Sequence, residues 1–212
     1  MGDPTISLME KLKPLAEVLA PDPRQRGFIR YDPDLRTYRP RTLNDFYSSI
    51  EDIELNPGTP DGVQTQFNTA KNLFVYSWFV YGFAPISDFM AYSALERALR
   101  ERSEREGLNV RRKGMGQMLK MAIERSWIQD DGIQHHRRIE TRRRETVKEW
   151  EEMGFVVQPT LSAGPRDYCA ILQKSFSDLR NSLAHGQGLI YPPSSLTLEL
   201  CADLINQLFP AL

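Results

Sequence analysis

Three residues in the string RNSLAHG, residues 180–186, could together act on a phosphate ester. The Arg180 guanidinium offers a fixed fork of donors that matches phosphate oxygens and stays charged at cellular pH. His185 carries an imidazole, which exchanges protons near neutrality and accelerates reactions by about 10²–10⁴ when well placed. Asn181 precedes His185 by four residues, so on a helix its amide could orient the imidazole. A base for a ribose 2′-hydroxyl and a cation for the phosphorus suffice to cleave RNA without metal.

The spacing of Arg180 and His185 limits what one chain can do. Five residues correspond to about 140° around an α-helix, so the two side chains cannot converge on one small group while the helix stays regular. Gly186 favours a helix end near Ala184 or His185, which would let the imidazole swing outward. A second chain could supply the missing partner. Alternatively, His185 and Gly186 only close the helix, because a cation and a glycine both suit a helix C-terminus.

The elements that must position these residues are helices, because apolar residues after Pro60 recur at helical rather than strand spacing. We expect an all-α fold, an up-and-down bundle of four to five core helices with one exposed charged helix on its flank. The expected helices cover residues 67–81, a stretch from Pro85 into the charged LRERSERE, residues 115–127, the charged piece 132–152, a helix after Gly164-Pro165 that carries RNSLAHG, and a last helix after Pro192-Pro193.

The first 59 residues have a different character, since eight of the fourteen prolines lie at or before Pro60. We interpret residues 1–59 as a Pro-rich N-terminal extension with short helices near residues 6–19 and 43–53. Residues 60–212 form the helical domain. From the helix that carries RNSLAHG, we expect three apolar side chains to enter the core of this domain, those of Phe176, Leu179 and Leu183.

The composition excludes several classes of protein. With 212 residues, 41% of them hydrophobic, the chain can bury a real core, and 27 basic against 28 acidic residues leave no net charge to attract nucleic acid or membrane as a whole. No zinc site or disulfide framework can be assembled from Cys169 and Cys201, which we expect to be buried and reduced. No leader or membrane span is recognisable, so we expect a soluble cytoplasmic protein without a cofactor.

A basic run at residues 135–144 is the second candidate for function. It contains five arginines against one glutamate and could track a phosphate backbone; the residues are Arg137, Arg138, Arg142, Arg143 and Arg144. The alternative is a solvated helix face balanced by the glutamates one turn later. The aromatic residues between Phe74 and Phe83 could stack bases, but their helical spacing favours a core or dimer interface. Common nucleotide, metalloprotease and hydrolase motifs are absent.

The string RNSLAHG on the helix before a final amphipathic helix resembles the HEPN superfamily (higher eukaryotes and prokaryotes nucleotide-binding domains). The mark of that family is an Arg, four to six residues and then a His, often with a polar residue directly after the Arg. The segment AYSALERALRERSERE, which contains Glu96, is similar to an earlier core helix of the family. The resemblance covers residues 60–212.

This resemblance implies a dimeric all-α bundle whose two motifs face each other. Many members are metal-independent ribonucleases in toxin–antitoxin, phage-defence or RNA-processing roles, and others are non-catalytic dimerisation or binding modules. Carried over, Arg180 and His185 would be the catalytic pair, Asn181 the polar position, and Glu96 a carboxylate near the motif; alternatively, Glu96 only pairs with Arg100 on the surface. The implied partners are RNA, a second copy of the chain, and an antitoxin or regulatory protein.

Overall fold

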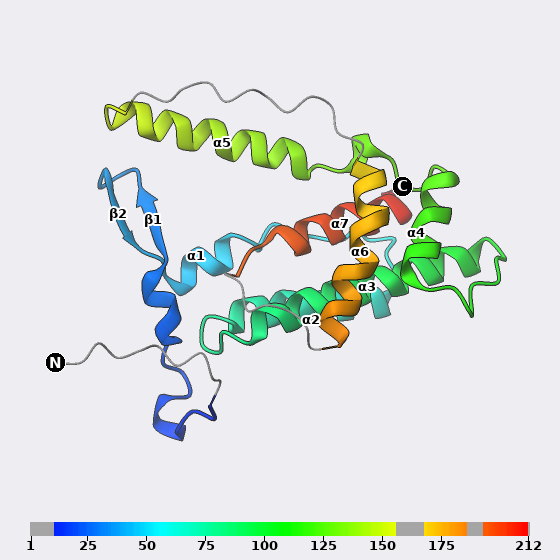
Figure 1. Ribbon diagram of the computed structural model, residues 1–212, viewed down its shortest axis with the longest axis horizontal. Coiled ribbons are helices and arrows are strands. Elements are labelled where there is room, and N and C mark those ends of the chain that lie inside the picture. The colour runs from blue at the N-terminus through cyan, green and yellow to red at the C-terminus, as the bar shows by residue number, and fades with distance from the viewer. Residues whose placement is uncertain (1–10, 156–167, 186–192, 212) are drawn as a thin grey trace.

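The computed structural model describes residues 11–155, 168–185 and 193–211 (Figure 1). Helices account for 61% of the structure and strands for 5% of it, which confirms the predicted all-α class. The α-helices among the described residues are α1 (Leu43–Ser48), α2 (Asp61–Tyr76), α3 (Phe83–Arg105), α4 (Met115–Glu124), α5 (His135–Glu152), α6 (Tyr168–Ala184) and α7 (Leu196–Leu208). Short 3-10 turns cover Leu15–Glu17, Pro23–Gly27 and Asp130–Gly132, and an antiparallel hairpin joins β1 (Ile29–Asp32) to β2 (Thr37–Pro40).

The core is built around α3, which contacts α2, α4, α6 and α7 (Figure 1). The predicted stripe on α2 is confirmed for Phe67, Ala70 and Phe74, all of which are buried. The helix ends at Tyr76, earlier than expected, where the backbone tightens and the Trp78 and Phe79 amides donate three residues back, to the Val75 and Tyr76 carbonyls. The aromatic run therefore divides, with Trp78 buried in the core and Tyr76 exposed.

Both cysteines are reduced and buried, as predicted. Burial raises the pKa of the Cys201 thiol well above its ordinary value, and the nearby Asp88 carboxylate acts in the same direction. A thiol held in its neutral form is a poor nucleophile and a poor metal ligand. Cys201 is therefore a packing residue. In the described parts of the chain, no helix is both long and apolar enough to cross a bilayer.

The N-terminal segment contributes to the same core as the later helices. Phe46 of α1 is fully buried, and its ring meets the Phe74 and Trp78 rings at centroid distances of 5.5 and 5.2 Å. Further along, the Asn56 side chain donates to the Phe209 carbonyl at 3.0 Å. Residues 43–59 are thus anchored at both ends to the helical part. The expected helix at residues 43–53 is shorter and covers only Leu43–Ser48. Of the expected helix at residues 6–19, residues 6–10 lie outside the described residues, and the rest forms only a 3-10 turn at Leu15–Glu17.

The hairpin was not predicted from the sequence, and one carboxylate joins it to α1. Asp45 accepts from Arg39 Nη1 at 2.6 Å and Nη2 at 2.9 Å, and from Arg30 Nη1 at 2.9 Å. Asp45 also completes a capping box with Thr42 at the start of α1. The bonds from Arg39, together with those from Thr42, outweigh burial and hold the pKa of Asp45 well below its ordinary value.

We expect the Asp45→Asn variant to lose about 2 kcal/mol of unfolding free energy at neutral pH, because it removes a charge-assisted bidentate contact. Since the folded pKa of Asp45 is depressed, its contribution is present above the ordinary aspartate pKa of about 3.9 and is lost as the pH falls further. Urea unfolding of both proteins between about pH 6 and 2 should show the difference narrowing in acid. A constant difference would contradict this role.

Candidate functional site

The helix that carries the candidate motif, α6, packs against α3 and α4. The Phe176 ring is buried and meets the Tyr92 ring of α3 edge-on at a centroid distance of 5.0 Å. Leu183 is partly buried against the same core. The expectation for Leu179 was wrong, since 48% of this residue is exposed. Leu179 lies at the edge of the buried stripe because successive residues turn by about 100°.

Arg180 turns from α6 toward α3. Its Nη2 lies 3.0 Å from Glu96 Oε2, and its guanidinium carbon lies 5.8 Å from the centre of the Phe89 ring. The Nη1 atom donates to Asn181 Oδ1 at 3.4 Å. The Nε atom is buried and has no hydrogen-bond partner among the described residues. About a third of the side chain, 31%, remains exposed. Arg180 is therefore a half-buried cation in a defined orientation, with an exposed part available to an anion.

Glu96 joins the earlier core helix to the motif. Besides Arg180, its carboxylate faces Arg100 Nη2 at 3.7 Å. Both interpretations of Glu96 therefore apply, since it pairs with Arg100 and also lies beside Arg180. The shorter distance is the one to Arg180. Glu96 thus fixes the guanidinium of Arg180 and does not itself face His185.

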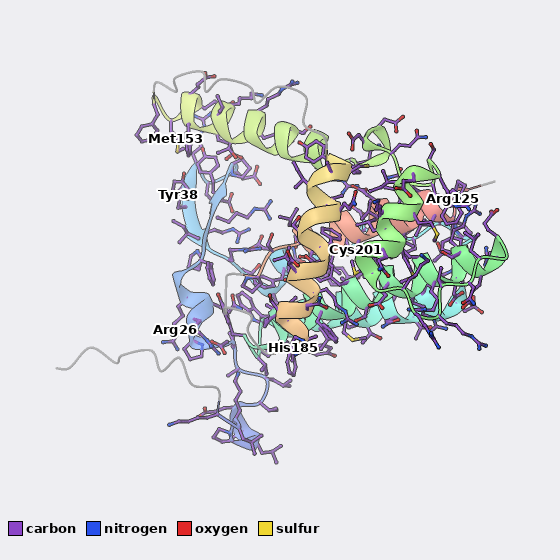
Figure 2. All side chains as sticks on the ribbon, turned by 45° about the vertical axis from the view of Figure 1, so that its right-hand side comes forward. Arg26, Tyr38, Arg125, Met153, His185 and Cys201 are labelled. Atoms are coloured by element: carbon purple, nitrogen blue, oxygen red, sulfur yellow. The ribbon has the colours of Figure 1, made fainter. Side chains whose placement is uncertain are left out.

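His185 lies at the end of α6 and is exposed (Figure 2). The helix ends at Ala184, within the predicted limits, while Gly186 lies outside the described residues. The His185 imidazole has no hydrogen bond or ion pair with the residues that the structure describes. No hydrogen bond joins the Asn181 amide to the imidazole, and the Asn181 oxygen accepts instead from Arg180.

Arg180 and His185 consequently do not converge within one chain. Arg180 is directed to Glu96 on the core side, and His185 is exposed to solvent. The five-residue spacing predicts this divergence. The site residues that the fold brings together are Glu96, Arg180 and Asn181, and His185 stands apart from them.

The basic helix α5 lies beside the beginning of α6, whereas His185 is at the opposite end of α6 (Figures 1 and 2). Its Arg138 is engaged in the fold, with Nη2 at 2.5 Å from Asp203 Oδ1 and Nη1 at 3.6 Å from Glu199 Oε2. Both carboxylates are buried on α7. Arg138 therefore holds α5 against α7, and less than half of its side chain, 36%, is exposed.

Of the remaining arginines of α5, only Arg144 has a side chain that the structure describes. Arg144 is exposed, and the side chains of Arg137, Arg142 and Arg143 lie outside the described part. At the far end of α5, Trp150 Nε1 donates to the Tyr38 hydroxyl of β2 at 3.3 Å. The sequence carried one signal for the Arg138 contact, namely two carboxylates four residues apart in the apolar helix LTLELCADL. A pair of this kind needs a cation from another element.

No protein-family model matches the chain, and no curated protein or solved structure is significantly similar to it. The candidate site is consequently defined by its own side chains. Among the side chains that the structure describes, which do not include those of His135, His136 and Glu140, no three His, Cys, Asp or Glu residues are grouped as metal ligands. The groups that can act on a substrate in this region are the Arg180 guanidinium and the His185 imidazole.

Proposed function

We propose that this chain is an endoribonuclease of the HEPN type that cleaves single-stranded RNA without a metal ion. The observation that carries the proposal is the fixed, half-buried Arg180 on a helix whose end exposes His185. Glu96 and Asn181 hold the guanidinium from two sides, so an anion that reaches its exposed edge would meet a preorganised cation. The resemblance of RNSLAHG to the family motif supports the same assignment.

The reaction is transesterification by the ribose 2′-hydroxyl. His185 takes the proton of that hydroxyl, whose oxygen attacks the adjacent phosphorus, and Arg180 stabilises the negative charge of the phosphorane. The bond from phosphorus to the 5′ oxygen breaks, this oxygen takes up a proton from water, and His185 returns its proton to the solvent. The products are a 2′,3′-cyclic phosphate and a 5′-hydroxyl end. No redox step or bound cofactor is needed.

A second copy of the chain would complete the site. Ile171 and Leu179 are both 48% exposed, and on a helix they fall with His185 within an arc of about 120°. An apolar surface beside an exposed histidine supports a two-fold contact along α6, in a bundle that dimerises as the family does. The shared site that we propose pairs the His185 of one chain with the Arg180 of the other. Because Arg180 is turned by about 160° from the centre of this arc, the partner's imidazole would reach its exposed third from the rim of the contact.

RNA further from the cut would meet α5. Arg144 is exposed and available to a phosphate, and Arg137, Arg142 and Arg143 would act with it, whereas Arg138 is occupied by two carboxylates. The cellular setting that we propose is a cytoplasmic toxin or phage-defence effector, held in check by an antitoxin or regulatory protein.

The direct test is RNA cleavage by the purified protein in excess EDTA. We expect single-stranded RNA to yield 2′,3′-cyclic phosphate ends, and the same sequence with 2′-deoxyribose to stay intact, because the nucleophile is then absent. Product ends can be identified by mass spectrometry. Cleavage of both substrates, or cleavage that EDTA abolishes, would contradict the mechanism. No cleavage of varied RNAs would favour a non-catalytic binding module.

A further inference from the structure

The connection between α3 and α4 carries three adjacent positive charges, and the nearest acidic residue along the chain is Glu106, five residues before the first of them. Arg111, Arg112 and Lys113 are consecutive, and no Asp or Glu occurs in residues 107–123. By contrast, the arginines of α5 are followed closely by Glu145, and further glutamates balance the rest of that helix. A local cluster of one sign attracts counter-charges even in a chain of net charge −1. We call Arg111, Arg112 and Lys113 the basic loop.

The basic loop stands between fixed points of the core. The chain leaves α3 through Gly107, whose φ of +72° is left-handed, and the Leu108 amide donates back to the Ser103 carbonyl at 3.0 Å. Val110 is buried, and its carbonyl accepts from Arg100 Nη1 at 3.0 Å. Met115, at the start of α4, is also buried. The three cations are therefore presented by an anchored turn, which lowers the ordering cost of binding.

The side chains of the basic loop are free for a ligand. All three residues are exposed, and their side chains form no ion pair or hydrogen bond with the described residues. Most neighbouring cations are instead paired within their own helices. Arg102 meets Glu106 at 3.0 Å and Lys120 meets Glu124 at 3.8 Å. The paired residues contribute little net field, whereas the basic loop keeps its full charge.

The chain on either side of the basic loop favours a hydrophilic, highly charged ligand. Between residues 87 and 149, no large apolar side chain that the structure describes is exposed. A lipid surface or an amphipathic protein helix would need such apolar contact. A nucleic-acid backbone needs only cations at suitable spacing, because its binding is driven by the release of counterions from phosphates.

We propose that the basic loop binds the phosphate backbone of single-stranded RNA, an inference that rests on the proposed ribonuclease function. Glu96 beside Arg180 and Arg105 at the end of α3 are nine residues apart, about 14 Å of helix rise. The basic loop follows Arg105 at that end of α3 (Figure 1). It thus lies a few nucleotides from the candidate site and would hold the strand outside the reacting phosphate.

The test measures binding of a fluorescent 2′-O-methyl oligouridylate of about 20 nucleotides, which cannot be cut through its 2′ oxygen, from about 50 to 200 mM salt. Fluorescence anisotropy is recorded for the full chain and for the combined R111Q, R112Q and K113Q variant. Each lost phosphate contact on a single strand reduces the slope of log affinity against log salt by about 0.7, so the slope should flatten by about 2. A variant with the wild-type slope would overturn the inference.

The matched control replaces three exposed cations of the N-terminal segment, in the combined K11Q, R26Q and R36Q variant. It changes the net charge equally and should keep the slope within a few tenths of the wild-type value. A decrease equal to that of the loop variant would overturn the inference, because it would reflect total charge. Binding that depends on the basic loop, without RNA cleavage, would refute the proposed ribonuclease activity but support RNA binding by the loop. RNA cleavage together with binding that does not depend on the loop would support the activity and refute RNA binding by the loop.

Discussion

Replacing His185 by alanine is expected to reduce RNA cleavage by about 10²–10⁴, the usual contribution of a general base. The side chain is exposed and bonds to none of the described residues, so its removal should leave the folded chain intact. The rate is measured in EDTA with saturating single-stranded RNA. The unfolding free energy, measured in urea, should change by less than about 0.5 kcal/mol.

His135→Ala and His136→Ala are matched controls, since they remove the other two imidazoles of the chain. Both lie on α5, at the opposite end of α6 from His185, and both variants should cleave RNA at the wild-type rate. If His185→Ala keeps the wild-type rate, His185 is only a helix-terminal residue. An equal loss in one of the controls would place the base on α5.

Replacing Arg180 by alanine is expected to slow cleavage by about 10²–10³, the cost of removing one donor that stabilises a developing oxyanion. Arg180→Lys should recover only part of this rate, because an ammonium keeps the charge but loses the planar fork. The same assay in EDTA measures both variants. The reduction should appear in kcat rather than KM, since the contact strengthens in the transition state.

Arg100→Gln is the matched control for Arg180. It removes the other cation that faces Glu96, together with the bond to the Val110 carbonyl, while leaving the contact between Glu96 and Arg180 in place, so the rate is compared at saturating RNA. Its cleavage rate should stay within a few-fold of wild type. Should Arg180→Ala and Arg100→Gln lower the rate equally, the effect would come from the packing of α3 against α6 and not from a role in the reaction.

The core helices could be predicted from the sequence because they carry apolar stripes of the helical period. Phe67, Ala70 and Phe74 of α2 are buried as expected, and α6 ends where glycine follows the motif. The hairpin escaped prediction because its strands are four residues long and mostly exposed. Its stability comes from Asp45, which lies in the next element and so has no signature within the strands.

The local character of the candidate site could be predicted, but its long-range contacts could not. The five-residue spacing correctly separates Arg180 from His185, because that angle depends only on helix geometry. Asn181 was expected to support His185, but no hydrogen bond joins the two side chains, and the Asn181 oxygen accepts from Arg180 at 3.4 Å, a contact that the sequence did not indicate. Arg138 appeared as one cation in a run, and only the fold reveals the buried Asp203 that it meets.

Mixing the two inactive variants tests most directly whether the site is shared between two chains. Arg180→Ala and His185→Ala chains are unfolded together and refolded at equal concentration, and RNA cleavage is measured in EDTA. In mixed dimers one interface site keeps both an Arg180 and a His185, so we expect the mixture to regain up to about a quarter of the wild-type rate. A mixture no more active than the single variants, or a chain that stays monomeric in light scattering, would contradict the shared site.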